Sequence, residues 1–310
     1  MEKFDLVIIG GSAAAMTAAI YASRRNLHYA IISKDFGGEV ATSGEVENWP
    51  GVIHTTGIEL AMQFRGHVES YKPDMRDDVW VEKIIKRDDG MLEVHAKDGS
   101  RELSLEAKAV IVATGVHPRE LSVPGEKDLR GKGVTYCTVC DGPLFDGKEV
   151  VVVGGGNSAL ESALMLADIA KHVTVVNKNA EFRGEKVLID NLAKKQNVRI
   201  IFNAETKEII GDGAVSGLAY TDADGSAHTI DVQGVFVHIG MIPNSDIVPS
   251  DVAKNNFNEI KVNAACETNI PGLFAAGDVT NVPYKQIVIA AGQGCTAALS
   301  AVAYLNRISS

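Results

Sequence analysis

Cysteine and positive charge are scarce in this chain. Four cysteines among 310 residues are too few to staple a secreted, disulfide-rich scaffold. Lysine and arginine together number 30 against 40 acidic residues, which gives a net charge of −10. A protein that mainly binds nucleic acid usually presents a basic face, so we expect no nucleic-acid partner.

A signal peptide and a long apolar run are also lacking. The first residues, Met1 to Asp5, lead directly into a strand-like run. We find no apolar stretch of the roughly 18 residues that a membrane helix needs. We therefore expect a soluble cytoplasmic protein with no membrane partner. In a compartment where thiols stay reduced, a CxxC motif is more often catalytic or metal-binding than structural.

The length of the chain favours two domains, and an internal repeat indicates how they are built. Phe4–Ile9 predicts a buried strand, residues 14–24 a helix and Tyr29–Ile32 a second strand, which together form a βαβ unit. The same unit recurs 144 residues later, from Val151 to Val176, without a gap.

A second pair of segments repeats at a spacing of 125 residues: Val110–Gly115 and Val235–Gly240. Both predict strands that end in a crossover turn, and their final glycines are candidate hinges. The simplest account is an α/β protein with two Rossmann-type domains, the second inserted into the first, in a three-layer ββα arrangement. We expect the host domain at 1–115 and 245–310 and the inserted domain at 116–244.

Each copy of the βαβ unit has a turn between its first strand and its helix. A strand followed by G-x-G-x-x-G/A brings the backbone close to a pyrophosphate, which then rests on the helix N-terminus. Gly154, Gly156 and Ala159 fit this pattern inside a βαβ unit. In the first copy Ser12 and Ala15 stand where glycines are expected. The Ser12 hydroxyl could donate to a phosphate, or the turn could be a packing turn without a ligand.

The end of the second strand in each copy is where a ribose is usually recognised. Asp35 lies near this point in the first copy and fits a ribose diol. The second copy has Asn177, Lys178 and Asn179 there, followed by Arg183. No acid is present to bind the 2′-hydroxyl of NAD, whereas the two cations could meet a 2′-phosphate. We therefore favour NADPH and keep NADH as possible.

A polar residue and a long helix close the host domain. Asp278 follows the run Gly272–Ala276, so it could accept hydrogen bonds from a sugar or polyol, or be an ordinary turn residue. Tyr284–Ile287 opens an apolar helix that runs to about Asn306. We expect a core helix whose N-terminal dipole could also stabilise negative charge on a reduced flavin.

The pair Cys137 and Cys140 is the most specific pattern in the chain. Two intervening residues permit a reversible disulfide and can lower the pKa of one thiol. Asp141 follows directly and could exchange the proton. The alternatives are half a zinc site, which lacks a second CxxC, and two inert core thiols. Cys266 and Cys295 are isolated and are expected to be buried as small apolar residues.

The eight histidines show no metal-ligand spacing, so we expect no metal. His117 and His238 border the proposed hinges and are expected to be structural. The sequence supports no Ser-His-Asp arrangement.

Seven stretches together resemble the low-molecular-weight thioredoxin reductase family, closest to the reductase core of the alkyl hydroperoxide reductase flavoprotein subunit. The resemblance covers essentially the whole chain. The stretches are Gly37–Glu39, Val46–Gly51, Cys137–Phe145, Gly154–Ala159, Cys266–Thr268, Phe274–Asp278 and Pro283–Ile287.

The resemblance implies FAD in the host domain, a nicotinamide nucleotide in the inserted domain, and a homodimer. It implies that Asn48 lines the flavin ring and that Asp278 holds the ribitol. It further implies that Cys140 exchanges electrons with the flavin, that Cys137 attacks the partner, and that Asp141 is the acid/base. Lys285, Gln286 and Ile287 would meet the pyrimidine side of the flavin. The remaining expected cofactor-binding positions are Gly10, Gly38, Glu39, Ala113, Thr114, Gly115, Asn157, Ser158, Ile239, Gly240 and Gly277.

Three stretches depart from the family pattern. The first turn is normally glycine-rich where Ser12 and Ala15 stand. Glu39 replaces a usual glutamine beside the flavin, and Asn177–Asn179 replaces the His-Arg-Arg that thioredoxin reductases use for the 2′-phosphate. The sequence does not decide between the two nicotinamide nucleotides.

The expected function is the transfer of electrons from NAD(P)H through FAD and the dithiol to a thioredoxin-like disulfide. The alternatives are a glutaredoxin-like or peroxiredoxin-linked partner, electrons from ferredoxin, a flavin dithiol oxidase, and a nucleotide-sensing binding module. Because dithiol and nucleotide site lie in the same inserted domain, we predict that this domain rotates about the hinges near Gly115 and Gly240 between half-reactions.

Overall fold

The computed structural model describes residues 2–43 and 45–308. The chain forms two compact units, and each is described by itself. The host unit comprises Met1–His117 and Ile242–Ser310, and the inserted unit comprises Pro118–Met241. We predicted the changeovers from the sequence at 115/116 and 244/245, two and three residues from those of the structure. Strands β9 (Val116–Pro118) and β18 (Met241–Pro243) pair with each other where the chain passes from one unit to the other.

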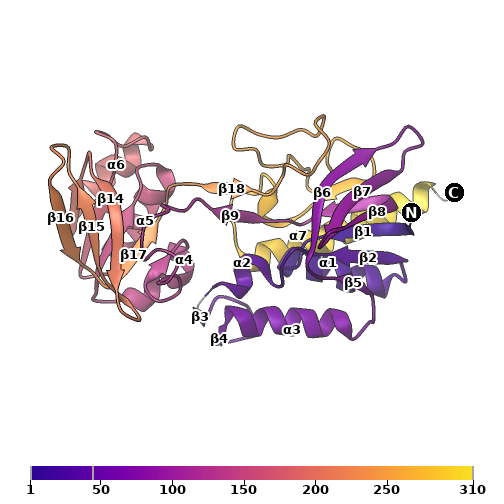
Figure 1. The fold of residues 1–310 in the computed structure, drawn as a ribbon, viewed down its shortest axis with the longest axis horizontal. Coiled ribbons are helices and arrows are strands. Elements are labelled where there is room, and N and C mark those ends of the chain that lie inside the picture. The colour runs from indigo at the N-terminus through magenta and orange to yellow at the C-terminus, as the bar shows by residue number, and fades with distance from the viewer. Residues whose placement is uncertain (1, 44, 309–310) are drawn as a thin grey trace. The chain divides into compact units, whose positions relative to one another are not determined.

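The host unit is built on a seven-stranded sheet in the order β5-β2-β1-β8-β7-β6, with β19 also paired to β8 (Figure 1). Strands β1, β2, β5, β8 and β19 are parallel, and β6 and β7 extend the sheet in antiparallel fashion. The strands are β1 Glu2–Ile9, β2 Tyr29–Ile32, β5 Asp74–Arg76, β6 Val79–Lys86, β7 Leu92–Asp98, β8 Arg101–Val112 and β19 Leu273–Ala275.

Strand β8 joins the two parts of this sheet because it is long. Its 12 residues pair with β7 over Arg101–Ala107 and with β1 over Leu105–Val112. The antiparallel strands β6 and β7 are therefore continuous with the parallel part of the sheet. A short hairpin, β3 (Glu45–Val46) and β4 (Thr55–Thr56), lies outside the sheet.

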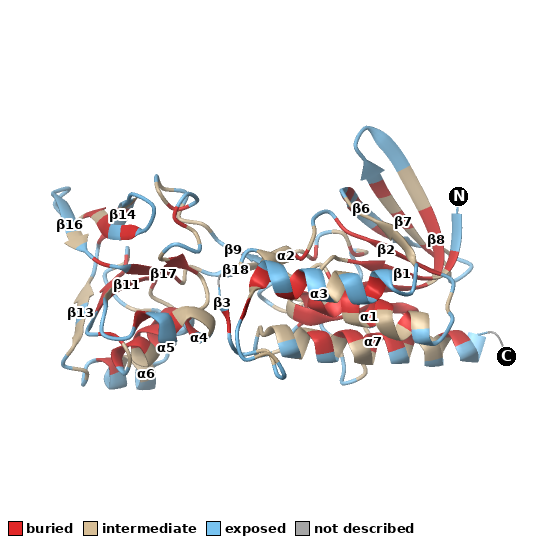
Figure 2. Cartoon of the chain, turned by 90° about the horizontal axis from the view of Figure 1, so that it is seen from below, coloured by how far each residue is buried: buried red, intermediate tan, exposed pale blue. Residues whose placement is uncertain are grey.

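Within the described residues, the helical elements of the host unit are α1 Ala13–Arg24, α2 Gly38–Ala41, α3 Gly57–Glu69, α7 Ile287–Ile308 and the 3₁₀ turn η2 Gly277–Val279. Figure 2 shows α1 and α7 next to each other, with much of α1 buried. The two helices approach closely because small residues meet: a Cβ on Gly294 would lie 2.0 Å from Ala14 O. This packing fixes α1, whose N-terminus follows the first glycine turn.

Helix α7 corrects two expectations. It begins at Ile287 and not at Tyr284, so Lys285 and Gln286 lie in the loop before it. The expectation that no stretch is long and apolar enough for a membrane was wrong by length and composition, since an 18-residue window of the 22-residue α7 has a mean hydropathy of 1.5. The reason is its many alanines, which raise the mean although Gly, Gln, Thr and Ser are interspersed. Its buried residues pack inside the host unit, and they make up 28% of this window.

The inserted unit has a five-stranded parallel sheet in the order β10-β17-β11-β12-β13. Its strands are β10 Val134–Thr135, β11 Glu149–Val153, β12 His172–Val176, β13 Val198–Ile201 and β17 Gly234–Val237. A separate antiparallel sheet contains β14 Glu205–Gly211, β15 Val215–Thr221 and β16 Ala227–Asp231. The helical segments are α4 Thr138–Asp141, η1 Gly142–Phe145, α5 Asn157–Ala167 and α6 Lys186–Leu192.

The two units repeat one backbone contact as well as one topology. Gly10 has φ +138° and Gly154 has φ +146°, both in the region that favours glycine. A Cβ on Gly10 would lie 2.2 Å from Ala113 O, and a Cβ on Gly154 would lie 2.2 Å from His238 O. These are the positions that the spacings of 144 and 125 residues align in the sequence. The predicted fold class, two Rossmann-type domains with one inserted into the other, is confirmed.

Candidate functional site

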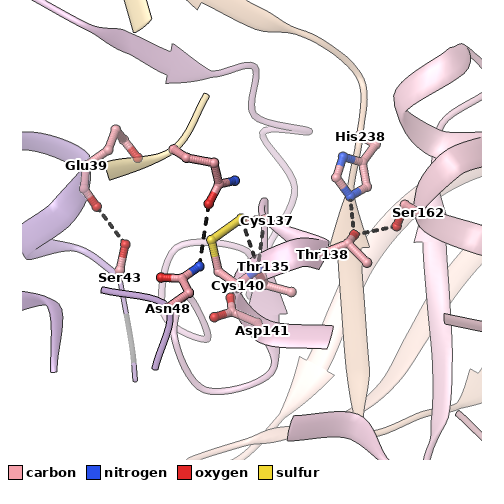
Figure 3. Close-up of a disulfide and its surroundings, with 11 residues drawn as sticks. Glu39, Ser43, Asn48, Thr135, Cys137, Thr138, Cys140, Asp141, Ser162 and His238 are labelled. Atoms are coloured by element: carbon pink, nitrogen blue, oxygen red, sulfur yellow. Dashed lines mark hydrogen bonds between the residues drawn. A yellow bond between two sulfur atoms is a disulfide. The ribbon is translucent and has the colours of Figure 1, made fainter. Parts of the chain in front are cut away.

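The redox pair lies at the start of the short helix α4. Cys137 and Cys140 are joined by a disulfide, with Cα atoms 5.3 Å apart (Figure 3). Cys137 is the N-cap residue, and its Sγ accepts a hydrogen bond from Cys140 N at 3.2 Å. Cys137 N in turn donates to Thr135 Oγ1 at 3.2 Å. A partial positive helix N-terminus therefore faces Cys137, which is the environment that stabilises a thiolate.

Asp141 closes the same helix. Its carboxylate accepts a hydrogen bond from the Thr135 hydroxyl. Burial raises the pKa of Asp141, and the Thr135 hydrogen bond opposes that rise. A carboxyl group with a raised pKa holds its proton nearer to neutral pH, which suits it to exchange a proton with a thiol. Thr135 was not singled out in the sequence, because a lone threonine two residues before a cysteine carries no recognisable pattern.

The nucleotide turn of the inserted unit has the open backbone that the pattern predicts. No atom of the described chain lies within 4 Å of a Cβ built on Gly156, and no side chain caps the α5 N-terminus there. Ala159 is buried beneath the turn, whereas Asn157 and Ser158 are exposed in the first turn of α5. Asn157 Oδ1 accepts a hydrogen bond from Glu185 N at 2.8 Å. The turn can therefore take a phosphate on its free amides.

The residues after β12, which should select the nucleotide, differ in exposure: Asn177 is buried and Lys178 is exposed. Asn177 is 1% exposed, and its side chain donates to Glu181 O and accepts from Asn179 N. It therefore braces the loop and is not available to a ribose. Lys178 and Arg183 are exposed. Arg183 N donates to Gly155 O at 2.8 Å, which holds Arg183 beside the turn.

The other predicted positions of the inserted unit follow β17. Ile239 is partly buried, and Gly240 is exposed with φ +118°. Gly240 O accepts a hydrogen bond from Arg119 N at 2.9 Å.

The first glycine turn, in the host unit, forms despite its two departures from the pattern. Ser12 has φ −120°, an extended conformation that any residue adopts, and it caps α1 through no side-chain hydrogen bond. Ala15 is fully buried. Asp35 is exposed, and its carbonyl oxygen would lie 2.4 Å from a Cβ on Gly11. The turn therefore leaves the α1 amides open to a phosphate with an acidic side chain next to it.

Asp278 is the most informative residue of the host unit. Its Oδ1 is buried and has no hydrogen-bond partner among the described residues. Burial raises the pKa of Asp278 to about 6, Lys285 opposes the rise, and Glu39 and Glu259 add to it. A buried carboxylate oxygen without a partner is costly, so this atom is best explained as an acceptor for a ligand hydroxyl.

Several other predicted residues of the host unit make contacts within that unit. Asn48 Nδ2 donates to Gln286 Oε1 at 3.5 Å (Figure 3), and Lys285 Nζ lies 2.9 Å from Glu259 Oε1. Gly277 N donates to Gln293 Oε1 at 2.8 Å, a contact that the sequence did not indicate. Ala113 is buried at the end of β8.

Four more predicted residues of the host unit lie after β8, in α2 and at the start of α7. The Thr114 hydroxyl donates to Asn244 O at 2.7 Å, and Gly115 has φ +66°. Gly38, with φ +52°, lies beside Ser12, since a Cβ there would be 3.3 Å from Ser12 Cβ. Ile287 is the first residue of α7.

These observations fit a dinucleotide in the host unit. The free amides at α1 suit a pyrophosphate, the exposed Asp35 suits a ribose, and the partnerless Asp278 oxygen suits a polyol hydroxyl. FAD offers all three groups.

A polar cluster of Thr138, Ser162 and His238 lies next to the disulfide in the inserted unit. Thr138 Oγ1 lies 2.5 Å from Ser162 Oγ and 2.8 Å from His238 Nε2. We expected His238 to be structural, and its contact with the residue next to Cys137 was not foreseen. The three residues are far apart in the sequence, so no local spacing reveals them.

Two further groups contain residue types that can bind a metal or react as thiols. Possible ligand atoms of Glu45, Glu47 and His54 lie within 4.8 Å of one another, and all three residues are exposed. The sequence expectation of no metal did not single out this group. Cys266 is buried, which raises the pKa of its thiol to about 11, and Cys295 is partly buried. Cys266 is thus buried as we expected, whereas the same expectation was wrong for Cys295.

Comparisons with known proteins agree with this geometry. Residues 4–294 match the family model described as pyridine nucleotide-disulphide oxidoreductase. The chain is 43% identical to the F subunit of alkyl hydroperoxide reductase of Escherichia coli and 42% identical to an NADH dehydrogenase of Ferdinandcohnia aciditolerans, over 99% of this chain. It spans only 59% and 58% of the length of these two curated relatives.

A solved structure matches along its full length. The crystal structure of thioredoxin reductase from Streptococcus pyogenes superposes with a TM-score of 0.92 at 37% identity, covering 98% of this chain and 99% of that one. The predicted resemblance to this group of reductases is therefore confirmed.

Proposed function

Because the chain belongs to the pyridine nucleotide-disulphide oxidoreductase family, we propose that it is an FAD-dependent disulfide reductase. It would move electrons from NAD(P)H through FAD to the Cys137–Cys140 disulfide, and from the resulting dithiol to a thioredoxin-like protein disulfide. The observation that carries this proposal is a disulfide-bonded CxxC motif, followed by a partly buried acid with a raised pKa, in the same unit as an open nucleotide turn.

The host unit would hold FAD, which when bound accepts a hydride and passes an electron pair to a disulfide. The α1 amides and Ser12 would hold its pyrophosphate, Asp35 a ribose, and Asp278 its ribitol. Asn48 and the loop of Lys285 and Gln286 would border the flavin ring.

The inserted unit would hold the nicotinamide nucleotide on the amides at Gly156 and the start of α5. The exposed Lys178 and Arg183 support a preference for NADPH, since both can approach a 2′-phosphate and no strand-end acid repels it. NADH stays possible, because neither cation forms the paired arginines of a dedicated phosphate site.

In the second half of the cycle the chain's own residues act on the partner. The Cys137 thiolate attacks one sulfur of the partner disulfide, and the other partner sulfur leaves as a thiolate. The Cys140 thiolate then attacks Cys137 in the mixed disulfide, which restores the Cys137–Cys140 bond and releases the second partner thiolate. Asp141 would supply or take the protons of these steps.

A second partner class is favoured by one comparison. The relative at 43% identity is named as the F subunit of an alkyl hydroperoxide reductase, and the chain spans 59% of it. We propose a glutaredoxin-like or peroxiredoxin-linked disulfide as the alternative acceptor. The homodimer and the cytoplasmic location stay predictions.

Rapid anaerobic mixing tests the donor and the acceptor separately. FAD-loaded protein is mixed with NADPH and with NADH, and the yellow absorbance of the flavin is followed. We expect faster bleaching with NADPH. Oxidised thioredoxin or oxidised glutaredoxin is then added, and faster reoxidation identifies the acceptor. Protein that binds no FAD, or a flavin that neither nucleotide bleaches, would contradict the proposal.

A further inference from the structure

Helix α4 is tied to the inserted unit by side chains that the proposed cycle does not use. The Thr138 hydroxyl meets Ser162 on α5 at 2.5 Å and His238, just after β17, at 2.8 Å (Figure 3). Thr138 and Ser162 are buried, and His238 is partly buried. Thr138 is the first residue of α4 and adjoins Cys137. Any displacement of Thr138 therefore moves the turn that carries both sulfurs.

The internal repeat shows that the fold does not require these polar side chains. At the spacing of 144 residues Ser162 corresponds to Ala18, and at the spacing of 125 residues His238 corresponds to Ala113. Both alanines are buried in the host unit, and Ala113 O makes the same close approach to its glycine turn as His238 O. The same backbone thus forms with alanine at both positions.

The host unit also lacks the feature that the two side chains contact. Its sequence contains no CxxC motif, and the dithiol is present only in the inserted unit. The serine hydroxyl and the imidazole therefore add polar contacts where the dithiol turn, and not the Rossmann scaffold, needs support.

One arrangement of protons satisfies all three groups. Desolvation lowers the pKa of His238 to about 4, so the imidazole is neutral near pH 7. With its proton on Nδ1, Nε2 accepts from the Thr138 hydroxyl, and the Ser162 hydroxyl donates to Thr138 Oγ1. The threonine oxygen is then held from two elements, α5 and the end of β17. Held in this way, the first turn of α4 keeps the Cys140 amide directed at Cys137 Sγ.

We propose that Thr138 is a positioning residue for the redox pair, held in place by Ser162 and His238. Its two hydrogen bonds fix the first turn of α4 in the conformation in which the sulfurs meet, and so stabilise the disulfide relative to the dithiol. The role of these hydrogen bonds in catalysis rests on the proposed function. The equilibrium between the disulfide and the dithiol, which they would shift, can be measured on the chain without FAD, nucleotide or partner.

The test is the thiol–disulfide equilibrium of flavin-free protein with glutathione. Oxidised glutathione takes two electrons from the dithiol: its own S–S bond breaks, the Cys137–Cys140 bond forms, and two protons pass to the two glutathione thiols. The oxidised fraction is measured by alkylating free thiols and weighing the protein by mass spectrometry. We expect Thr138→Val to lower the equilibrium constant for disulfide formation roughly three- to tenfold, the effect of losing one or two hydrogen bonds. Thr138→Ser, which keeps the hydroxyl, should stay within about twofold of the parent.

A matched control removes a hydroxyl from the same unit without breaking a hydrogen bond. Thr206 is 8% exposed, and its Oγ1 has no partner in the part of the chain that the structure describes. Thr206→Val should leave the equilibrium constant unchanged. If it shifts the constant as far as Thr138→Val does, the proposal is overturned.

A double-substitution cycle separates positioning from a general loss of packing. Ser162→Ala installs the residue that the host unit carries at this position, so the scaffold has a precedent for tolerating it. Alone it should lower the constant, and in Thr138→Val it should lower it no further, because both changes remove the same hydrogen bond. Fully additive effects, or a constant unchanged in every variant, would overturn the proposal.

This readout does not depend on the proposed function. The equilibrium needs no FAD, no nucleotide and no protein partner. A parent protein that fails to use NAD(P)H would contradict the reductase proposal and still give a readable equilibrium constant. Circular dichroism of each variant verifies its fold, and Ser162→Ala keeps the test decisive if Thr138→Val does not fold.

Discussion

Asp278 makes the stability of flavin-free protein depend on pH in an unusual direction. Its carboxyl has a pKa of about 6 in the folded protein against 3.8 for an unperturbed group, mainly because it is buried. A raised folded pKa means that the contribution to stability is fully present below pH 4 and is lost as pH rises through 6. The structure therefore predicts that ionising Asp278 weakens the host unit.

The magnitude follows from the two pKa values. Each pKa unit corresponds to about 1.4 kcal/mol, so the full loss of unfolding free energy is about 3 kcal/mol, of which roughly 2 kcal/mol falls between pH 4 and pH 7. The Asp278→Asn side chain cannot ionise, so this variant should not lose unfolding free energy in this way. Other titrating groups are common to both proteins, so the difference between variant and parent isolates this residue.

Urea unfolding followed by tryptophan fluorescence measures the stability of the host unit. The two tryptophans, Trp49 and Trp80, both belong to the host unit, so their fluorescence follows its unfolding. We expect the gap between Asp278→Asn and the parent to widen by roughly 2 kcal/mol from pH 4 to pH 7. A gap that stays constant over this range would refute the assignment of a buried carboxyl with a raised pKa.

Three further outcomes follow from the site. Asp141→Asn should slow reduction of the partner disulfide roughly 10²-fold or more. Bleaching of the flavin by NAD(P)H, followed by stopped flow, should stay at the parental rate. An equal loss of rate in both steps would argue against an acid/base role. Gly154→Ala should destabilise the inserted unit, since its Cβ would lie 2.2 Å from His238 O. Gly156→Ala meets no atom within 4 Å and should weaken nucleotide binding alone. Calorimetry measures the binding and thermal melting the stability, and equal behaviour of both variants would contradict the account. The double variant of Lys178→Ala and Arg183→Ala should raise KM for NADPH roughly tenfold and leave KM for NADH nearly unchanged; equal changes for both nucleotides would remove the case for NADPH.

The sequence revealed the fold largely because this fold repeats itself. Two ungapped spacings, 144 and 125 residues, predict both Rossmann-type units and align Gly10 with Gly154 and Ala113 with His238. The structure places each glycine against the carbonyl oxygen of its aligned partner. Glycine turns and strand ends are local patterns, so reading them needs no knowledge of distant contacts.

Contacts between distant residues could not be read in this way. The cluster of Thr138, Ser162 and His238 joins positions 24 and 100 residues apart, and no spacing rule connects them. The partnerless oxygen of Asp278 likewise depends on which groups surround it in three dimensions. Helix α7 was misjudged for a different reason, since its many alanines raise its mean hydropathy although polar residues interrupt the apolar run.

Counting thiols under anaerobic conditions tests the central claim most directly. Oxidised, FAD-loaded protein is treated with NADPH, or with NADH, and its free thiols are alkylated and counted. The account predicts a gain of two thiols per chain, at Cys137 and Cys140, only when FAD is bound. A thiol count that does not change on adding either nucleotide would contradict it.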